Sequence, residues 1–272
     1  MCCFITHTKP NMTNNNKMQT PHKQRAREET ANFGFQKVPA QEKVKLVHKH
    51  FDSIARKYDF MNTLLSFGLH YLWKRTAVKM MGLQKGSRVL DVCGGTADLA
   101  MFAAGYIGSE GKVIVYDFNR AMMEAGKTKV HKALLAARIK YVQGDAEQIS
   151  FPEGSFDAAM VGFGIRNLTY MEKGFAEMYR VLKPGGTFMC LEFSRPANPL
   201  FRFLYDLYSF YIMPCIGFLF TGSRTAYTYL PESIRLFPQP DELSVILRSI
   251  GFSTVTWYRL TNGIAVVHVG VK

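Results

Sequence analysis

The stretch at residues 87–99, SRVLDVCGGTADL, constrains the fold more than any other part of the chain. An apolar run ends in Asp91, breaks at Gly94 and Gly95, and resumes with helix-forming residues, which predicts a strand, a tight turn and a helix. Glycine lets a ligand approach the backbone because it has no Cβ, and the start of the helix directs free N–H groups to the same place. The pattern therefore favours a site for an anionic group or a nucleotide at this turn.

A second apolar run, residues 112–117, ends in Asp117 about twenty residues after the turn, where dinucleotide-binding folds place a carboxylate that holds ribose hydroxyls. Two strands that each end in an acid indicate a cofactor that contains adenosine. The alternative is a turn that only packs a helix against a strand. It stays open at this point, because Cys93 and Ala97 stand at the outer positions of the fingerprint and such a fingerprint alone is a weak signal.

Composition limits the class of protein. With 272 residues, of which 47% are hydrophobic, the chain can fill the core of one α/β domain with extensions. A formal charge of +13 favours contact with an anionic surface and does not by itself distinguish nucleic acid from lipid headgroups. We expect a reducing, cytoplasmic setting and no metal, because no CxxC pair or metal-type spacing to histidine occurs among Cys2, Cys3, Cys93, Cys190 and Cys215.

The N-terminal part divides into a tail and a helical unit. Residues 1–40 are polar and basic without periodicity, and we expect them to form a disordered tail. From residue 41 onward, apolar residues recur every three or four positions, which predicts a helix with one buried face made by Val44, Val47, Phe51, Ile54 and Tyr58. A second helix, ended by Gly82, completes a unit of two helices at residues 41–82.

Strands and helices alternate after the turn. Expected strands at 139–143, 156–161 and 187–191 follow the two already named, with helices between them. This order predicts an α/β fold with a doubly wound parallel sheet, whose ligands lie beyond the carboxyl ends of the strands. Two final strands, residues 252–258 and 264–271, predict a closing antiparallel hairpin.

Residues 194–240 interrupt the alternation with an aromatic-rich segment, which predicts a helical insertion. Its apolar part, residues 207–221, contains Pro214 and Gly217 and is about fifteen residues long, which is short for a membrane span. We therefore expect this part to line a pocket or to lie in a membrane interface. The start of the chain lacks the apolar core of a signal peptide, so we do not expect secretion.

Several motifs carry a more specific signal: YDFMN at 58–62, SFGLH at 66–70 with WK at 73–74, GGT at 94–96, FGIRN at 163–167, KPGG at 183–186 and YLPESI at 229–234. Together they resemble the ubiquinone/menaquinone biosynthesis C-methyltransferases over residues 35–272. The resemblance implies a class I methyltransferase domain at residues 41–272, with a Rossmann-like sheet of seven strands and S-adenosyl-L-methionine as cofactor. It also implies that residues 194–240 form a cap over the substrate.

The resemblance assigns residues to the cofactor. Those implied to contact it, or to form the turn beneath it, are Asp91, Gly94, Gly95, Thr96, Asp117, Asp145 and Ala146. A carboxylate at Asp117 can accept both ribose hydroxyl protons, and Asp145 can accept from the adenine amino group. The chain departs from the family's usual residues at Tyr71, Cys93, Ala97 and Gly162. We expect at most a weaker cofactor affinity, provided that the backbone at Ala97 is helical.

The implied methyl acceptor is the ring of a polyprenylated hydroquinone, and the resemblance places Arg166, Asn167 and Tyr58 near it. A ring carbon attacks a methyl group poorly until the neighbouring hydroxyl, with a pKa of about 10, ionises. Arg166 stays protonated, so we expect it to stabilise the phenolate, while water, Tyr58 or His70 receives the proton. We expect the acceptor to be the naphthoquinol, demethylmenaquinol, rather than a benzoquinol.

Other classes of protein compete with this interpretation. A dehydrogenase predicts every glycine of the dinucleotide fingerprint, which Cys93 and Ala97 contradict. A methyltransferase acting on RNA predicts basic residues interleaved with aromatic ones, whereas the insertion is aromatic and aliphatic. A methyltransferase for another small hydrophobic acceptor, and a membrane-surface protein without activity, are the remaining alternatives. We expect an enzyme at the inner face of the membrane, without a nucleic-acid partner, and leave open whether it is a homo-oligomer.

Overall fold

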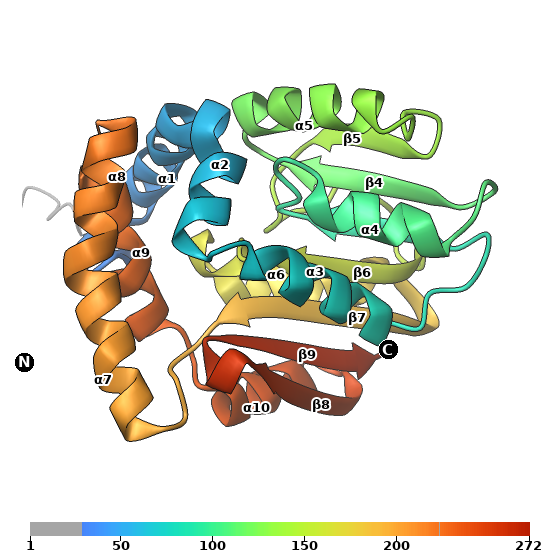
Figure 1. Ribbon diagram of the computed structural model, residues 1–272. Helices are drawn as coiled ribbons and strands as arrows, with labels where there is room; N and C mark the ends of the chain where they lie inside the picture. The colour runs from blue at the N-terminus through green and yellow to red at the C-terminus, as the bar shows by residue number, and fades with distance from the viewer. Residues whose placement is uncertain (1–28, 223) are drawn as a thin grey trace, which may run out of the picture.

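A computed structural model of the protein describes residues 29–222 and 224–272 (Figure 1). Its main sheet has seven strands in the order β5-β4-β3-β6-β7-β9-β8. Their bounds are β3 (Arg88–Val92), β4 (Lys112–Asp117), β5 (Ile139–Gln143), β6 (Phe156–Gly162), β7 (Leu182–Phe193), β8 (Ser253–Leu260) and β9 (Ala265–Val271). The first five strands in this order pair in parallel, and β9 runs antiparallel to both of its neighbours. The predicted α/β fold with its closing antiparallel hairpin is confirmed.

Helices cover both faces of the sheet (Figure 1). On one face lie α3 (Leu69–Met80), α4 (Asp98–Tyr106) and α5 (Arg120–Lys132), and on the other lie α6 (Met171–Val181) and α10 (Pro240–Ile250). Strand β3 shows why both layers form, because Val89 belongs to the first core cluster and the adjacent Leu90 to the second. Successive side chains of a strand point to opposite faces, so a continuous apolar strand requires cover on both sides.

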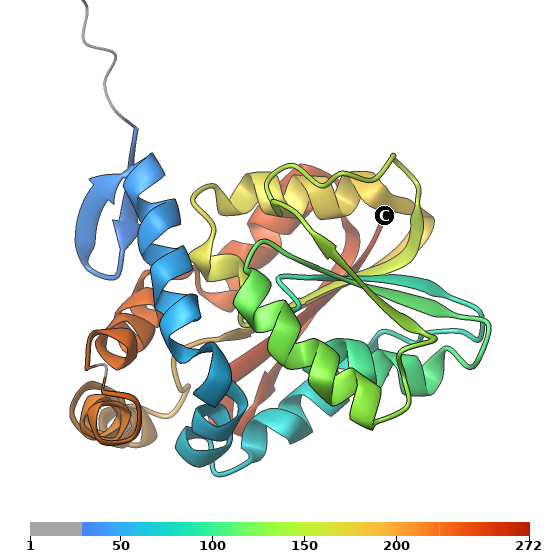
Figure 2. The ribbon, with the colours of Figure 1, turned by 90° about the horizontal axis from the view of Figure 1, so that it is seen from above.

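A further helical layer lies across the edge of the sheet where the parallel strands end (Figures 1 and 2). It consists of α1 (Ala40–Ile54), α2 (Tyr58–Leu65), α7 (Pro199–Leu207), α8 (Met213–Thr221) and α9 (Arg224–Leu236). These helices share a small apolar core of their own, in which Ile54, Met61 and Leu65 pack with Met213 and Tyr227. The expected first helix of the 41–82 unit is thus divided, because a 3-10 turn at Ala55–Lys57 separates α1 from α2.

The N-terminal segment departs from the sequence-based prediction. Residues 1–28 of the expected tail lie outside the described residues, but β1 (Thr30–Phe33) and β2 (Gln36–Pro39) form an antiparallel hairpin beside α1 (Figure 2). The Phe33 ring stacks on Tyr229 with centroids 4.4 Å apart, and the Phe35 N–H donates to the Glu232 carboxylate. The prediction of disorder was wrong for residues 30–39, because contacts with α9 stabilise a hairpin that its own composition does not indicate.

The insertion also differs from expectation. Helices α7 and α8 are joined by a π-helical turn, Tyr208–Ile212, so residues Pro199–Thr221 form one helix of 23 residues that by length and composition could cross a membrane. The expectation of a segment too short for a span was wrong, because the helix starts at Pro199 and continues through Pro214, which lies just after the π-helical turn where the regular hydrogen-bond pattern already changes. Burial is confined to one side of this helix, at Ser209, Met213, Pro214 and Gly217.

Substitution of Gly217 tests the packing of α8 on α9. A Cβ at residue 217 would lie 2.1 Å from the ring of Tyr227. G217A should therefore lower the free energy of unfolding by about 1–3 kcal/mol through overpacking. The matched control is Gly105 in α4, where a Cβ meets no atom within 4 Å, so G105A should raise the same quantity by roughly 0.5–1 kcal/mol. Urea unfolding measures both, and equal stability of G217A and wild type would contradict the packing argument.

Candidate active site

Several residues of the glycine turn after β3 have a positive φ, and glycine occupies only some of these positions. Gly95 has a φ of +49°, and a Cβ at Gly94 would lie 2.9 Å from the Asp91 side chain. Both positions therefore require glycine. Cys93 and Ala97 also have positive φ values, 53° and 67°. The condition of a right-handed helical backbone at Ala97 is therefore not met, and an alanine there costs roughly 1–2 kcal/mol that a glycine would avoid.

Acids from neighbouring strands lie beside this turn. The Asp117 carboxylate ends β4 and accepts hydrogen bonds from the N–H groups of Gly95 and Asn119, each at 2.8 Å. Burial raises the pKa of Asp117 to about 6, although these N–H groups favour its charged form. Asp145 follows the adjacent strand β5, and its side chain accepts from the Glu147 N–H at 2.8 Å.

These groups surround one cavity at the carboxyl ends of β3, β4 and β6. The predicted cofactor residues that line it are Asp91, Gly94, Gly95, Thr96, Asp117 and Asp145. Ala146 is not among the lining residues and is buried in the core cluster beneath α6. The acids and the glycine turn fit the adenosine-containing cofactor expected from the sequence, because they offer acceptors for hydroxyl and amino groups next to a closely approachable backbone.

A second cavity adjoins the first, and its walls are mainly aromatic and aliphatic. The residues that line both cavities are Phe51, Tyr58, Lys74, Phe163 and Asn167. Helices α1, α2, α3, α7 and α9 supply most of the second lining, including Phe201, Leu204, Tyr205, Tyr227 and Leu230. All the residues predicted near the methyl acceptor, namely Tyr58, His70, Arg166 and Asn167, lie in its wall.

Arg166 is held rigidly in this wall. Its Nη1 atom lies 2.8 Å from the Glu192 carboxylate and donates to the Phe163 carbonyl at 2.7 Å, while Nε donates to the Ser233 hydroxyl. Burial, the largest single effect, would lower the pKa of Arg166, but Glu192, Tyr229 and Tyr58 together raise that pKa, so the guanidinium remains charged. Sequence reasoning did not assign a role to Glu192, although an acid near the end of the last parallel strand was a usable signal.

His70 and Asn167, which both line the second cavity, each have a buried polar atom that lacks a partner among the described residues. His70 Nε2 pairs with the Thr63 hydroxyl at 3.2 Å, and the Asn167 side-chain oxygen accepts from the Tyr229 hydroxyl at 2.9 Å. Within the described parts of the chain, His70 Nδ1 and Asn167 Nδ2 are buried without a partner. Burial, followed by the nearby Lys74 charge, lowers the pKa of His70 to about 4, so its ring is neutral. Unpaired buried groups cost about 1–3 kcal/mol each, which favours a polar ligand here.

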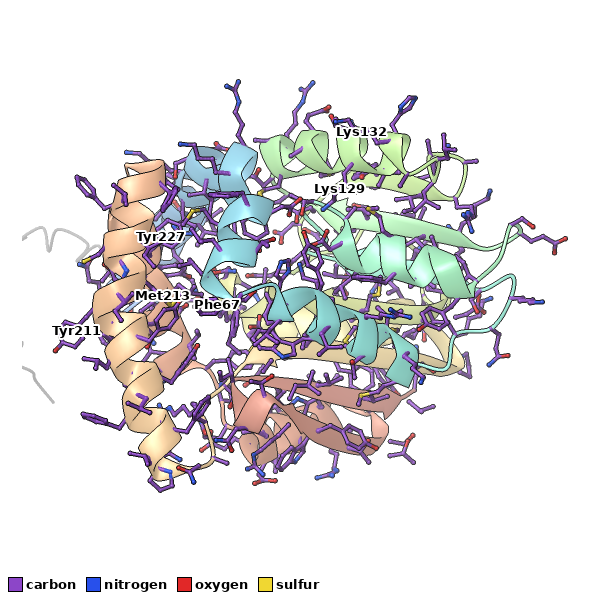
Figure 3. The ribbon with its side chains drawn as sticks, viewed as in Figure 1. Phe67, Lys129, Lys132, Tyr211, Met213 and Tyr227 are labelled. Atoms are coloured by element: carbon purple, nitrogen blue, oxygen red, sulfur yellow. The ribbon has the colours of Figure 1, made fainter. Side chains whose placement is uncertain are left out.

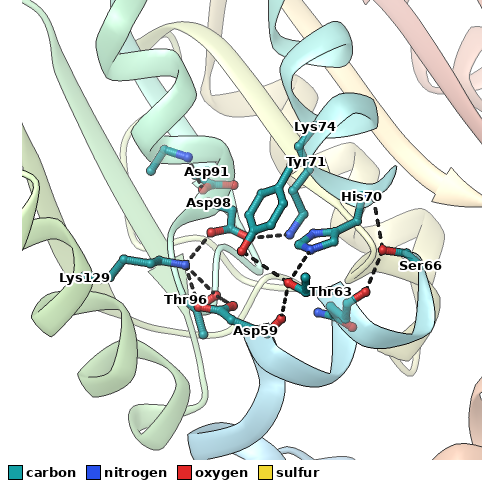
Figure 4. Close-up of polar contacts among 12 residues, drawn as sticks. Asp59, Thr63, Ser66, His70, Tyr71, Lys74, Asp91, Thr96, Asp98 and Lys129 are labelled. Atoms are coloured by element: carbon teal, nitrogen blue, oxygen red, sulfur yellow. Dashed lines mark hydrogen bonds and ion pairs between the residues drawn. The ribbon is translucent and has the colours of Figure 1, made fainter. Parts of the chain in front are cut away.

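A chain of charged groups that the sequence did not predict ties the helical layer to the glycine turn (Figure 4). The Thr96 hydroxyl and the Lys129 ammonium donate to the Asp59 carboxylate at 2.6 and 2.7 Å. Lys129 also pairs with Asp98, which in turn accepts from Lys74 at 2.6 Å. Burial would raise the pKa of Asp98, but the two lysines lower it to about 2. No local pattern reveals this network, because its members come from α2, α3, α4, α5 and the turn.

A doubly wound sheet with two strand-end acids beside a glycine turn, and with an apolar cavity next to them, defines a class I S-adenosylmethionine-dependent methyltransferase. Solved structures share this fold. A SAM-dependent methyltransferase from Aquifex aeolicus superposes with a TM-score of 0.58 at 19% identity, over 78% of this chain and 97% of that chain. A possible histamine N-methyltransferase from Thermotoga maritima gives 0.58 at 20% identity, over 82% and 99%.

Sequence comparison identifies the family within this class of methyltransferases. The model of the ubiE/COQ5 methyltransferase family matches residues 37–272. The ubiquinone/menaquinone biosynthesis C-methyltransferase UbiE of Ectopseudomonas mendocina is 43% identical over 94% of this chain and 100% of its own length. That of Azotobacter vinelandii is 42% identical over 91% and 98%. The chain belongs to the ubiE/COQ5 methyltransferase family, and it is an S-adenosylmethionine-dependent C-methyltransferase.

The carboxyl group of Asp91 predicts a pH-dependent stability. Asp91 is fully buried, and burial raises the pKa of its side chain to about 8, although the Ala100 N–H donates to it. A raised pKa in the folded state means that the unfolded chain binds fewer protons between the usual carboxyl pKa and about 8, so stability falls as pH rises through this window. The slope from one such group is at most about 1.4 kcal/mol per pH unit.

D91N should flatten this dependence, because an amide stays neutral at every pH in the window. The measurement is urea unfolding of both proteins at about pH 6.5 and about pH 7.5. Burial lowers the pKa values of His50, His70 and His268 to about 4, which adds an opposite pH dependence that is common to wild type and D91N. The difference between the two proteins therefore reports Asp91. Across this interval the stability of wild type should fall relative to that of D91N. Identical changes in the two proteins would show that Asp91 is already ionised in the folded protein.

Proposed function

We propose that the chain transfers a methyl group from S-adenosylmethionine to a ring carbon of a polyprenylated hydroquinone, with demethylmenaquinol as acceptor. The observation that carries this proposal is the apolar cavity beside the cofactor cavity, with a buried guanidinium and two unpaired polar atoms in its wall. The printed name of the relatives, ubiquinone/menaquinone biosynthesis C-methyltransferase, supports a quinol substrate. It does not distinguish the two rings.

The residues of the first cavity fit the cofactor. Asp117 would accept from the ribose hydroxyls and Asp145 from the adenine amino group, with Gly94 and Gly95 beneath them. When bound, the cofactor supplies a methyl group on a positively charged sulfur. Asp117 reaches this site with an oxygen already bound to the Gly95 N–H, so the turn and the carboxylate hold each other in position.

The residues of the second cavity account for activation of the ring. An ionised hydroxyl pushes electron density onto the neighbouring carbon, and the charged, immobile Arg166 stabilises that ionised form without reorganising. Asn167 Nδ2 is a free donor for the same oxygen or its partner across the ring. His70 Nδ1 is a free acceptor, and with a pKa of about 4 it passes a proton on to water rather than keeping it. Tyr58 lies at the boundary of the cavities, where the two reactants meet.

The lining of the acceptor cavity favours a quinol over RNA. Among its described residues, Lys74 and Arg166 are the permanent cations, and both are paired with carboxylates. An RNA acceptor needs several unpaired cations interleaved with aromatic rings along a groove. Another small hydrophobic acceptor is the second candidate, because an apolar cavity accepts rings of similar size.

An assay with labelled cofactor and both demethylated acceptors, the naphthoquinol and the benzoquinol, tests the proposal. Wild type should methylate demethylmenaquinol at the higher kcat/KM. R166K should lower kcat about tenfold to a hundredfold, because lysine keeps the charge but loses the planar fork, while cofactor affinity stays unchanged. Arg75 is exposed on α3, so R75K is the matched control and should equal wild type. Methylation of neither acceptor, or full activity of R166K, would contradict the proposal.

We also propose that this activity takes place at the cytoplasmic face of the membrane, with the outer side of Pro199–Thr221 against lipid. Figure 3 shows Tyr211 directed away from the molecule, whereas Met213 and Tyr227 point inward. Phe218 and Leu219 are 61% and 77% exposed on the same helix. The helix also lines the acceptor cavity through Phe201 and Leu204, so an exposed apolar surface continues into the cavity and provides a route for the prenyl tail.

Co-sedimentation with anionic liposomes tests this location. Apolar burial contributes about 25 cal/mol per Å² and each nearby basic residue about 1 kcal/mol, so binding should weaken with salt without vanishing. The F218S/F220S variant should bind severalfold more weakly than wild type. L134S is the control, because Leu134 follows α5 and is 87% exposed outside the insertion. Equal binding by wild type and F218S/F220S would exclude this surface as the lipid contact.

A further inference from the structure

The cofactor cavity has an unbalanced set of charges. The described acidic residues that line it are Asp91, Asp98, Asp117, Asp145 and Glu147, whereas Lys74 is the single lysine or arginine among the described lining residues. An S-adenosyl compound carries an amino-acid tail with its own carboxylate, and a carboxylate removed from water requires a cation or several N–H donors. Lys74 is therefore the lining residue whose positive charge can balance the carboxylate of this tail.

Lys74 has unused hydrogen-bonding capacity. Its side chain is 8% exposed, and Nζ donates to Asp98 Oδ2 at 2.6 Å. Across residues 29–222 and 224–272, this is the one hydrogen-bond partner of Nζ. An ammonium group has three donors, so two are available to a ligand. Because Lys74 lines both cavities, these donors lie close to their common boundary.

The charged network ends at Lys74. Asp59 binds Lys129, Lys129 binds Asp98, and Asp98 binds Lys74, so negative and positive groups alternate along it (Figure 4). Each interior member has a partner of opposite charge on two sides. Among the described residues, Lys74 has one oppositely charged partner, Asp98. A second anion on the other side of Lys74 would give it two such partners, like the interior members.

The chemistry of the reaction indicates which anion this is. In an S-adenosyl compound the sulfur carries the ribose on one side and the amino-acid tail on the other. The methyl group has to cross from the first cavity to the second, so the sulfur belongs near the residues shared by both, of which Lys74 is one. Asp117 lines the first cavity and not the second, and it is assigned to the ribose. The amino-acid tail, on the other side of the sulfur, therefore belongs near Lys74.

We propose that Lys74 binds the α-carboxylate of the cofactor's amino-acid tail. Lys74 is then a cofactor-binding residue, while Asp98 and Lys129 are positioning residues that hold its ammonium group at the boundary of the cavities. The inference rests on the cofactor site of the proposed function, and it assigns to that site a contact that the motif-based residues did not include.

The test compares S-adenosylmethionine with decarboxylated S-adenosylmethionine, which keeps the adenosine, the sulfonium and the amino group and lacks only the carboxylate. Calorimetry without acceptor should show that wild type binds S-adenosylmethionine at least about tenfold more tightly, as expected for one charge-assisted hydrogen bond. In K74M and K74Q the ratio of the two affinities, S-adenosylmethionine over the decarboxylated compound, should fall to about twofold or less. K74R keeps the charge and should retain most of the preference.

Controls separate this contact from a structural role and from failure of the site. R75M changes the exposed neighbour and should keep the wild-type ratio, while D117A should weaken both compounds alike. A K74M variant with the wild-type ratio would overturn the proposal, as would a wild type that does not distinguish the compounds. If K74M bound both compounds as wild type does but transferred the methyl group slowly, Lys74 would act on the methyl acceptor and not on the cofactor's carboxylate, and the proposal would be wrong. A wild type that binds neither compound would instead contradict the cofactor site itself.

Discussion

Burial of the central sheet on both faces decides where this protein can carry out polar chemistry. Strands such as β3 pack apolar side chains against helices above and below, so an acid in the middle of a strand would lose its hydration without gaining a partner. The acids instead stand near the carboxyl ends of parallel strands, as Asp91, Asp117 and Glu192 do. Because parallel strands end at one edge, these groups converge on a single region of the surface.

The converging acids avoid mutual repulsion because each has a different environment. Burial, with a smaller contribution from the charges of Asp117 and Asp98, raises the pKa of Asp91 to about 8 and leaves it mainly protonated at neutral pH. Asp98 faces two lysines, and its pKa of about 2 leaves it charged. Glu192 is paired with Arg166, and burial raises its pKa despite this pairing. A site with many carboxyl groups thus carries fewer negative charges at neutral pH than the number of its acids suggests.

The helical layer over this edge converts an exposed cofactor site into two adjoining cavities. Its apolar contacts, such as Met61 with Met213, supply cohesion within the layer, whereas Asp59 attaches it to the turn through Thr96 and Lys129. The two kinds of contact have different consequences. Apolar packing tolerates small displacements, but a partly buried ion pair has a defined geometry, so the position of α2 relative to the cofactor turn is set by the polar contacts.

The sequence by itself determined the parts of this protein that depend on local chemistry. Apolar periodicity predicted the sheet and its layers, and the glycine turn with Asp117 predicted a site at the carboxyl ends of the strands. The family resemblance of the FGIRN motif predicted that Arg166 and Asn167 share a site, and both line the second cavity. The hairpin at residues 30–39 was missed, because its stability depends on contacts with α9.

The tertiary structure alone decided which distant groups meet. Asp59, Lys74, Asp98 and Lys129 form one network although no spacing in the sequence connects them, and the side of α8 that is buried is set by α9, where Gly217 lies against the ring of Tyr227. The physical reason is the same in both cases. Local patterns report which face of an element is apolar, whereas the partner of a buried charge or of a helix face is set by elements brought together when the whole chain folds.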